Sequence, residues 1–359
     1  MRRWRFRNRF LLIQVALLLI PLFGRDLPRS IVLIIADGAG VGQHSLAYYH
    51  NDHYAPASFQ HVGLMATCPS DRERVTDSAA ASTAIATGVK TYNGAIAVDD
   101  NQKPLKTVLE YARERGMATG LVATSVITQA TPAAFAAHVD SRSKHAEIAR
   151  QMAAAGITVL FGGGRVHFLA QDRGGEQEID LLEAMSAHGV QIMAGLHEPL
   201  RGDHPVVGLF ADGSLPAADK NRQPTTAAMA LRALEILDND PDGFFLMVEE
   251  SQIDWGSSGN DADRVRAEMA SLNDLIDRVL AYQTQHPEVL VVFVADHETG
   301  GLAIQDKAMA SGLKAAWTTR GHTSNLVPIF ATGPGGEAFD AVVDNTFIGQ
   351  TLIKYVTSR

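Results

Sequence analysis

The sequence contains a single cysteine, Cys68, among its 359 residues. A chain with one thiol cannot form an internal disulfide bond, so its fold must be stabilised by the hydrophobic core and, we expect, by bound metal ions. We interpret Cys68 as a small, partly buried hydrophobic residue rather than a catalytic one. The chain beyond residue 25 also has no low-complexity linker and no internal repeat. The sequence therefore predicts one domain over residues 26–359.

Positive charge is scarce outside the N-terminus. The formal net charge is −9. Residues 1–25 hold six arginines, five of them within the first nine residues, so the rest of the chain is more acidic than the total suggests. An acidic body argues against a nucleic-acid groove or an anionic membrane surface as the main partner. If the protein binds an anionic substrate, local cations must attract it, and metal ions are the simplest way to supply them.

No hydrophobic run is long enough for a comfortable membrane span. The apolar run Phe10–Phe23 is broken by Gln14 and Pro21, and five arginines precede it. A basic segment followed by a short apolar segment is typical of a secretory signal peptide, which we expect over residues 1–25. The protein is then exported, periplasmic or extracellular, with no stable membrane association after cleavage. An uncleaved N-terminal anchor is the alternative, because no small-x-small cleavage site follows.

Apolar runs that indicate buried strands alternate with helical patterns along the chain. The predicted strands are Ile31–Ala36, Val62–Ala66, Ala118–Ala123, Thr158–Phe161, Phe244–Val248, Val289–Ala295 and Val327–Ala331. The predicted helices are Ser78–Thr87, Pro104–Arg115, His145–Ala154, Thr226–Leu237, Asp261–Tyr282 and Thr346–Val356. Continuous apolar strands separated by helices predict an α/β fold with a large, mostly parallel central sheet and helices on both faces.

Acidic residues follow three of the predicted strands. Asp37 follows the first strand, Glu249 follows the run Phe244–Val248, and the pair Asp296 and His297 follows the run Val289–Ala295. In open α/β sheets the binding crevice lies outside the carboxyl ends of the strands. We therefore expect these side chains to meet although they are far apart in the sequence.

A nucleophile candidate lies in the segment Arg74–Gly94. Asp77 can cap a helix that begins at Ser78, and the free N–H groups and dipole of the first helical turn favour an anion there. A serine nucleophile needs a partner that lowers the pKa of its hydroxyl. No histidine adjacent in the sequence serves as a base, so the sequence favours activation by a metal ion.

The run TDSAAASTAIATGVKTYNGAIAVD at residues 76–99 resembles the nucleophile segment of the alkaline phosphatase family. Further motifs resemble that family in the same order over nearly all of residues 30–358. These motifs are IVLIIADGAG (31–40), TPAAFAAHVDSR (131–142), FFLMVEESQIDWG (244–256), VADHETGG (294–301) and RGHTSN (320–325). The resemblance is to compact bacterial members and implies their three-layer α/β sandwich and a phosphomonoesterase activity.

The resemblance also implies a role for each matched residue. Ser78 would form a phosphoserine intermediate and Arg142 would bind the phosphate. Asp37, Asp296 and His297 would hold the second zinc, and Asp254 and His322 the first. Magnesium would be held by Asp37, Thr131 and Glu249. Relatives are commonly homodimers, which the resemblance implies here as well.

These residue types suit phosphoryl transfer. A phosphoryl group that passes between two oxygens needs positive charge on the entering and the leaving side, which two zinc ions about 4 Å apart provide. The planar fork of Arg142 matches two nonbridging phosphate oxygens, whereas a lysine would not. The oxygen ligands Asp37, Thr131 and Glu249 suit the harder magnesium ion.

Two positions depart from the family pattern. The family has a histidine four residues after the first zinc aspartate, where this chain has Ser258. A neutral hydroxyl is a poor zinc ligand compared with imidazole, so we expect a weak first zinc site, and Asp261 is the nearest acid in the sequence. Gln129 stands where relatives usually have aspartate or histidine, and its amide could orient a magnesium-bound water without adding charge.

Two other functions remain open on the sequence alone. A phosphodiesterase or sulfatase-type hydrolase of the same superfamily usually carries a different local motif around its nucleophile than TDSAAAST. A catalytically weakened phosphate- or metal-binding relative is the second alternative, because Ser258 replaces a zinc ligand. A purely structural or interaction role is disfavoured, because it does not require this set of acids and histidines.

Overall fold

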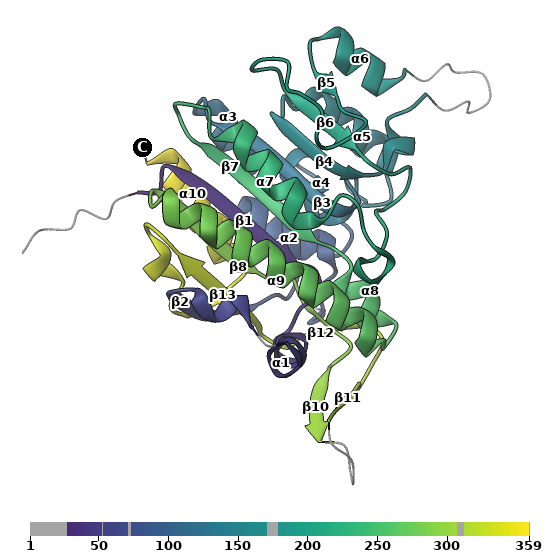
Figure 1. Ribbon diagram of the computed structural model, residues 1–359, viewed down its shortest axis with the longest axis vertical. Helices are drawn as coiled ribbons and strands as arrows, with labels where there is room; N and C mark the ends of the chain where they lie inside the picture. Colours follow the sequence, from purple (N-terminus) through teal and green to yellow (C-terminus); the bar gives the residue numbers. More distant parts are fainter. Residues whose placement is uncertain (1–26, 52, 71–72, 171–178, 307–311, 359) are drawn as a thin grey trace, which may run out of the picture.

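A ten-stranded sheet forms the centre of the protein in the computed structural model (Figure 1). The structure describes residues 27–51, 53–70, 73–170, 179–306 and 312–358. The predicted leader at residues 1–25 lies outside the described residues. None of the helices within these ranges is both long and apolar enough to cross a membrane.

The sheet is mostly parallel. Its strands, in spatial order, are β14 (Val342–Asp344), β2 (His61–Ala66), β13 (Val327–Thr332), β8 (Val289–Val294), β1 (Ser30–Ala36), β7 (Phe244–Glu250), β3 (Ala118–Val126), β4 (Val159–Gly163), β6 (Val206–Leu209) and β5 (Gln191–Ile192). Of the described strands in this sheet, β13 alone runs antiparallel to its neighbours. Two small hairpins pair β9 (Glu298–Thr299) with β12 (His322–Thr323) and β10 (Ala303–Asp306) with β11 (Leu313–Ala316).

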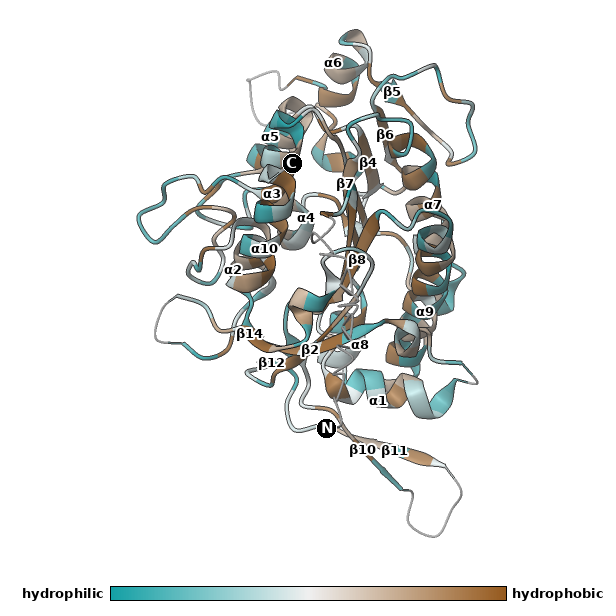
Figure 2. Cartoon of the chain, turned by 90° about the vertical axis from the view of Figure 1, so that its left-hand side faces the viewer, coloured by the Kyte–Doolittle hydropathy of each residue, from teal (hydrophilic) through white to brown (hydrophobic). Residues whose placement is uncertain are grey.

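Helices cover both faces of the sheet, which confirms the predicted three-layer α/β sandwich (Figure 2). One face carries α2 (Ser78–Thr87), α3 (Val108–Glu114), α4 (Ala130–Ala136), α5 (His145–Ala154) and α10 (Thr346–Thr357). The other face carries α7 (Thr226–Leu237) and α9 (Ala262–Gln285). Three further helices are α1 (Val41–His50) and α8 (Ile253–Ser258), which both pack against α9, and α6 (Leu181–Ala187), which packs against α5.

The central strands are hydrophobic along their whole length because both of their faces are covered. Every residue of β1, β7 and β8 is buried, as expected for parallel strands between two helical layers. Helices α2 and α10 approach closely at a pair of glycines. A Cβ added at Gly349 would lie 2.3 Å from the backbone nitrogen of Gly88, so a larger residue there would push the two helices apart.

Most of the predicted elements are confirmed. Helices α2, α5 and α7 have the predicted bounds, and each of the seven predicted strands is present with small changes at its ends. The predicted helix Pro104–Arg115 is wrong at its start, because Thr107 and Glu110 form a capping box and the helix begins at Val108. The sequence prediction missed α1, α4, α6 and α8, the strands β5, β6 and β14, and both hairpins.

Candidate metal centre and nucleophile

The three acidic strand ends meet at one edge of the sheet. Strands β8, β1 and β7 are parallel neighbours, with Ile35 opposite both Val294 and Glu249. Their carboxyl ends therefore bring Asp37, Glu249 and Asp296 together. The backbone N–H of Gly38, next to Asp37, donates to Asp296 Oδ1 at 3.1 Å and links two of these strand ends directly.

Asp37, Asp296 and His297 form a first group of candidate metal ligands. Their ligand atoms all lie within 4.8 Å of one another, and all three side chains are buried. His297 Nε2 lies 3.4 Å from Asp37 Oδ1 and 3.3 Å from Asp296 Oδ2. Both of those carboxylate oxygens are buried without a hydrogen-bond partner. Because buried, unsatisfied anionic oxygens are strongly unfavourable, this arrangement fits a cation between them.

Ser78 stands beside this first group. It is the first residue of α2, and the Asp77 side chain caps the helix by accepting from Ala80 N at 3.0 Å. The Ser78 hydroxyl is buried and lies 3.1 Å from His297 Nε2. A hydroxyl at a helix N-terminus and next to a cation site is in an environment that stabilises negative charge on its oxygen.

Asp254, His297 and His322 form a second group within the same 4.8 Å limit. His322 Nε2 lies 3.5 Å from Asp254 Oδ1, and the rings of His297 and His322 stack with centroids 3.6 Å apart. His322 Nδ1 lies 2.8 Å from the carbonyl oxygen of Thr76. Because a carbonyl only accepts, Nδ1 carries the proton and the Nε2 lone pair faces Asp254, as a metal ligand requires.

Glu249 lies close enough to Asp37 for its charge to act on that carboxyl group, and Thr131 lies beside Glu249. Both are fully buried, and Thr131 Oγ1 and Glu249 Oε1 have no hydrogen-bond partner. The second oxygen of Glu249 accepts from Ser251 Oγ at 2.6 Å, which holds the carboxylate in place. Two unsatisfied oxygens next to an aspartate match the ligand preference of magnesium.

The electrostatics of these carboxyl groups call for positive charge. Burial and the charges of Asp296, Asp254 and Glu249 raise the pKa of Asp37 well above its usual value. Burial is also the main reason that the pKa of Glu249 rises from 4.5 to about 7, and burial lowers the pKa of His297. Each group is shifted toward its neutral form. Bound cations would reverse the shifts of the two carboxyl groups by stabilising their ionised forms, and they would further favour the neutral imidazole of His297.

Arg142 reaches toward the N-terminus of α2. Its Nη1 donates to Asp77 Oδ2 at 3.0 Å, and its backbone N–H donates to Gly94 O at 2.8 Å. Gly94 N in turn donates to Asp77 Oδ2 at 3.1 Å. Asp77 therefore caps the helix that begins at Ser78 and also orients the guanidinium beside it. The structure thus brings all nine predicted site residues to one end of the sheet.

The departures from the family pattern also have clear positions. Ser258 is the last residue of α8, on the element that carries Asp254. Asp261 is not part of the second ligand group, and its Oδ1 accepts from Asp263 N and Arg264 N and caps α9. Gln129 precedes α4, and its side chain makes no capping hydrogen bond.

Three polar side chains around the ligands were not predicted. Ser125 and Ser251 contact Glu249 Oε2, and Thr299 Oγ1 contacts both Asp254 and His297. Thr299 lies two residues after His297 within the motif VADHETGG, which is the one signal in the sequence that could have identified it.

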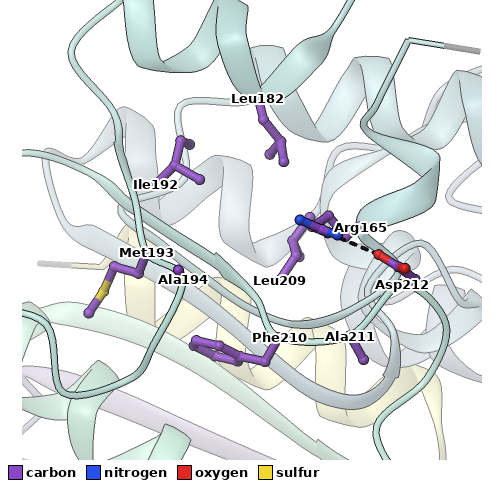
Figure 3. A pocket seen from close by; sticks show the side chains of 9 residues that line it. All are labelled: Arg165, Leu182, Ile192, Met193, Ala194, Leu209, Phe210, Ala211 and Asp212. Carbon is purple, nitrogen blue, oxygen red and sulfur yellow. Dashed lines mark hydrogen bonds and ion pairs between the residues drawn. The ribbon is translucent and has the colours of Figure 1, made fainter.

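A separate cavity of about 400 Å³ lies near β5, β6 and α6 (Figure 3). Its wall is mostly apolar, and Arg165 Nε is ion-paired with Asp212 Oδ1 at 2.9 Å. None of the predicted site residues lines it. The cavity is therefore distinct from the cluster at the carboxyl ends of β1, β7 and β8.

Comparison with known proteins places this fold in one class. The solved structure of alkaline phosphatase from the Antarctic bacterium TAB5 superposes with a TM-score of 0.86 at 34% identity, covering 92% of this chain and 98% of that one. Alkaline phosphatase 3 of Bacillus subtilis is 34% identical, covering 92% of this chain and 89% of its own. The alkaline phosphatase of Escherichia coli is 29% identical, covering 90% and 85%.

The alkaline phosphatase family model matches residues 28–314. The chain therefore belongs to the alkaline phosphatase family, a family of metal-dependent enzymes. One solved structure of the TAB5 enzyme, a variant with aspartate in place of a histidine, has Mg bound in the M3 site.

Proposed function

We propose that this protein hydrolyses phosphate monoesters through a phosphoserine formed at Ser78. The observation that carries the proposal is the position of the Ser78 hydroxyl, 3.1 Å from His297 Nε2 and at the edge of a buried cluster of unsatisfied carboxylate oxygens. Family membership supports the same reaction.

The residues present fit two zinc ions and one magnesium ion. The second zinc would be held by Asp37, Asp296 and His297, and the first zinc by Asp254 and His322. Magnesium would be held by Asp37, Thr131 and Glu249. When bound, these cations supply positive charge to the entering and leaving oxygens and lower the pKa of a coordinated hydroxyl or water. The orphaned oxygens of Asp37, Asp296, Glu249 and Thr131 support this assignment.

Ser78 and Arg142 act on the substrate itself. The Ser78 oxygen loses its proton and attacks phosphorus, the bond from phosphorus to the substrate oxygen breaks, and the leaving oxygen takes up a proton to give the alcohol. Water then cleaves the new bond between phosphorus and Ser78 and releases inorganic phosphate. Arg142, oriented by Asp77, holds two nonbridging oxygens through its planar fork during both displacements.

Rates on three substrate classes test this proposal against a diesterase or sulfatase. Purified protein with zinc and magnesium is assayed on a chromogenic phosphate monoester, a phosphate diester and a sulfate ester. We expect the monoester to have by far the highest kcat/KM, and Ser78→Ala to lower it on the order of 10³-fold or more, the scale of loss when a nucleophile is removed. A higher kcat/KM on the diester or sulfate ester would reject the proposal.

We also propose that the first zinc site binds weakly because Ser258 lacks an imidazole. A weak water-activating site slows the hydrolysis of the phosphoserine more than its formation. Ser258→His should therefore tighten zinc binding about tenfold or more and raise turnover at low zinc. Ser186→His, which adds an imidazole on the exposed face of α6, is the matched control. If zinc affinity and activity are the same in wild type and Ser258→His, Ser258 does not limit the site.

Export and self-association are further proposals. We expect residues 1–25 to direct the chain to the periplasm or the extracellular space, and the mature protein to be a homodimer, as the family resemblance implies. Mass spectrometry of the N-terminal peptide of the secreted protein shows whether residues 1–25 are removed. The mass of the native protein in solution shows whether it is a dimer.

A further inference from the structure

Thr299 lies between residues of the two candidate ligand groups. Its side chain is fully buried, and Oγ1 lies 2.6 Å from Asp254 Oδ1 and 3.2 Å from His297 Nδ1. We propose that Thr299 is a positioning residue that decides which nitrogen of His297 carries the proton. The inference depends on the proposed function only in what it says about zinc.

The single proton of the hydroxyl sets the direction of both contacts. A carboxylate is an acceptor only, so the Thr299 hydroxyl donates its hydrogen bond to Asp254. Toward His297 the same oxygen can then only accept, and Nδ1 must be the protonated nitrogen of the neutral ring. The hydroxyl therefore leaves His297 Nε2 with a free lone pair.

The lone pair of His297 Nε2 lies between the nucleophile candidate and two carboxylates. His297 Nε2 lies 3.1 Å from Ser78 Oγ and within 3.4 Å of both Asp37 Oδ1 and Asp296 Oδ2. A proton on Nε2 would prevent this nitrogen from accepting from Ser78 or binding a cation. In metal-free protein the two carboxylates attract a proton to Nε2, so the tautomer needs a group that holds the proton on Nδ1. Thr299 provides that group.

The backbone of Thr299 is fixed on both sides, which keeps its hydroxyl in place. Its N–H donates to Gly38 O at 3.2 Å, next to Asp37. Its carbonyl accepts from Gln43 Nε2 at 2.7 Å, and this fully buried amide also donates to Ser257 Oγ at 3.1 Å. Thr299 thus joins β9 to the loop after β1 and, through Gln43, to α8.

His322 offers an internal comparison. Its Nδ1 donates to the Thr76 carbonyl at 2.8 Å, so a backbone group sets the tautomer that Thr299 sets for His297. A substitution that removes the hydroxyl at position 299 should therefore change the tautomer of His297 and leave that of His322 unchanged.

The experiment compares wild type with Thr299→Val, which removes the hydroxyl at nearly constant shape, and Thr299→Ser, which keeps it. Histidine ¹⁵N spectra of metal-free protein at pH 8, assigned with His297→Gln, report the tautomers, and calorimetry reports zinc affinity. We expect Nδ1–H at His297 in wild type and the serine variant, and Nε2–H in the valine variant. Zinc affinity should fall about 10- to 100-fold in the valine variant alone.

The His322 signals also report whether the valine variant is folded, and Thr299→Ala provides the same contrast if it is not. A variant without the hydroxyl that keeps Nδ1–H at His297 and wild-type zinc affinity would overturn the inference. The metal-free spectra need no phosphatase activity, so an inactive wild-type protein would refute the proposed function while the spectra still decide the role of Thr299.

Discussion

At the scale of single residues, the site depends on charged groups held in fixed directions. Arg142 is the clearest case, because its fork is oriented by Asp77 before any substrate is present. A preorganised guanidinium can form two parallel hydrogen bonds to a phosphate group, and a lysine ammonium cannot reproduce that geometry.

Arg142→Lys should therefore weaken phosphate binding although the charge is kept. The loss of one charge-assisted hydrogen bond, roughly 1.5–3 kcal/mol, corresponds to about 10- to 150-fold weaker binding. The inhibition constant of inorganic phosphate measures this effect. Arg150→Lys, a substitution of an exposed arginine that pairs with Glu147, is the control. Equal inhibition of wild type and Arg142→Lys would show that the fork is not used.

The metal-ligand candidates were predictable residue by residue, whereas the hydroxyl side chains that contact them were not. Asp37, Asp296 and His297 follow apolar strands, and that pattern is visible without coordinates. Thr299 and Ser251 are common hydroxyl residues, and their importance depends on distances to Asp254, His297 and Glu249 that only the folded chain defines.

At the scale of elements, the N-terminus of α2 combines two tasks. The Asp77 side chain caps the helix through one carboxylate oxygen and holds Arg142 through the other. Substitutions of Asp77 can therefore remove the contact with Arg142 alone or remove it together with the helix cap.

Asp77→Ser should keep the cap and lose the partner of Arg142, while Asp77→Ala should lose both. We expect the alanine variant to be about 0.5–2 kcal/mol less stable and the serine variant to be close to wild type. Both should bind phosphate more weakly. Urea unfolding and phosphate inhibition measure the two quantities. Wild-type phosphate affinity in both variants would contradict the positioning role of Asp77.

Two of the helices that the sequence prediction missed lack the local signals of a helix. Helix α4 contains Pro132 and is otherwise mainly alanine, so it has no amphipathic period, yet Pro132 lies in its first turn, where a helix needs no N–H donor. Helix α1 begins after Gly40 without a side-chain cap. Such helices are stabilised by packing, which a local sequence pattern does not report.

At the scale of the whole molecule, the buried acids make the protein dependent on cations. In metal-free protein the pKa of Asp37 is raised, and that of Glu249 rises from 4.5 to about 7, so the folded state binds more protons than the unfolded state in this range. The stabilising effect of these protons is lost as the pH rises through the folded-state pKa.

The free energy of unfolding of metal-free protein should therefore fall between about pH 4.5 and 7, and the fall should be smaller with zinc and magnesium bound. The pKa of Glu268, outside the site, is also raised to about 7 and contributes in both forms. The difference between the two forms therefore isolates the metal centre. Urea unfolding across this range, with chelator or with metals, measures it, and parallel curves would contradict the account.

The most direct test of the central claim is to trap the phosphoryl group on the protein. Protein with zinc and magnesium is mixed with a phosphate monoester, quenched in acid, and digested for mass spectrometry. The account predicts a phosphorylated peptide that contains Ser78, present with metals and absent after chelation or in Ser78→Ala. Phosphate on another residue, or hydrolysis with no phosphorylated Ser78 at any metal concentration, would contradict it.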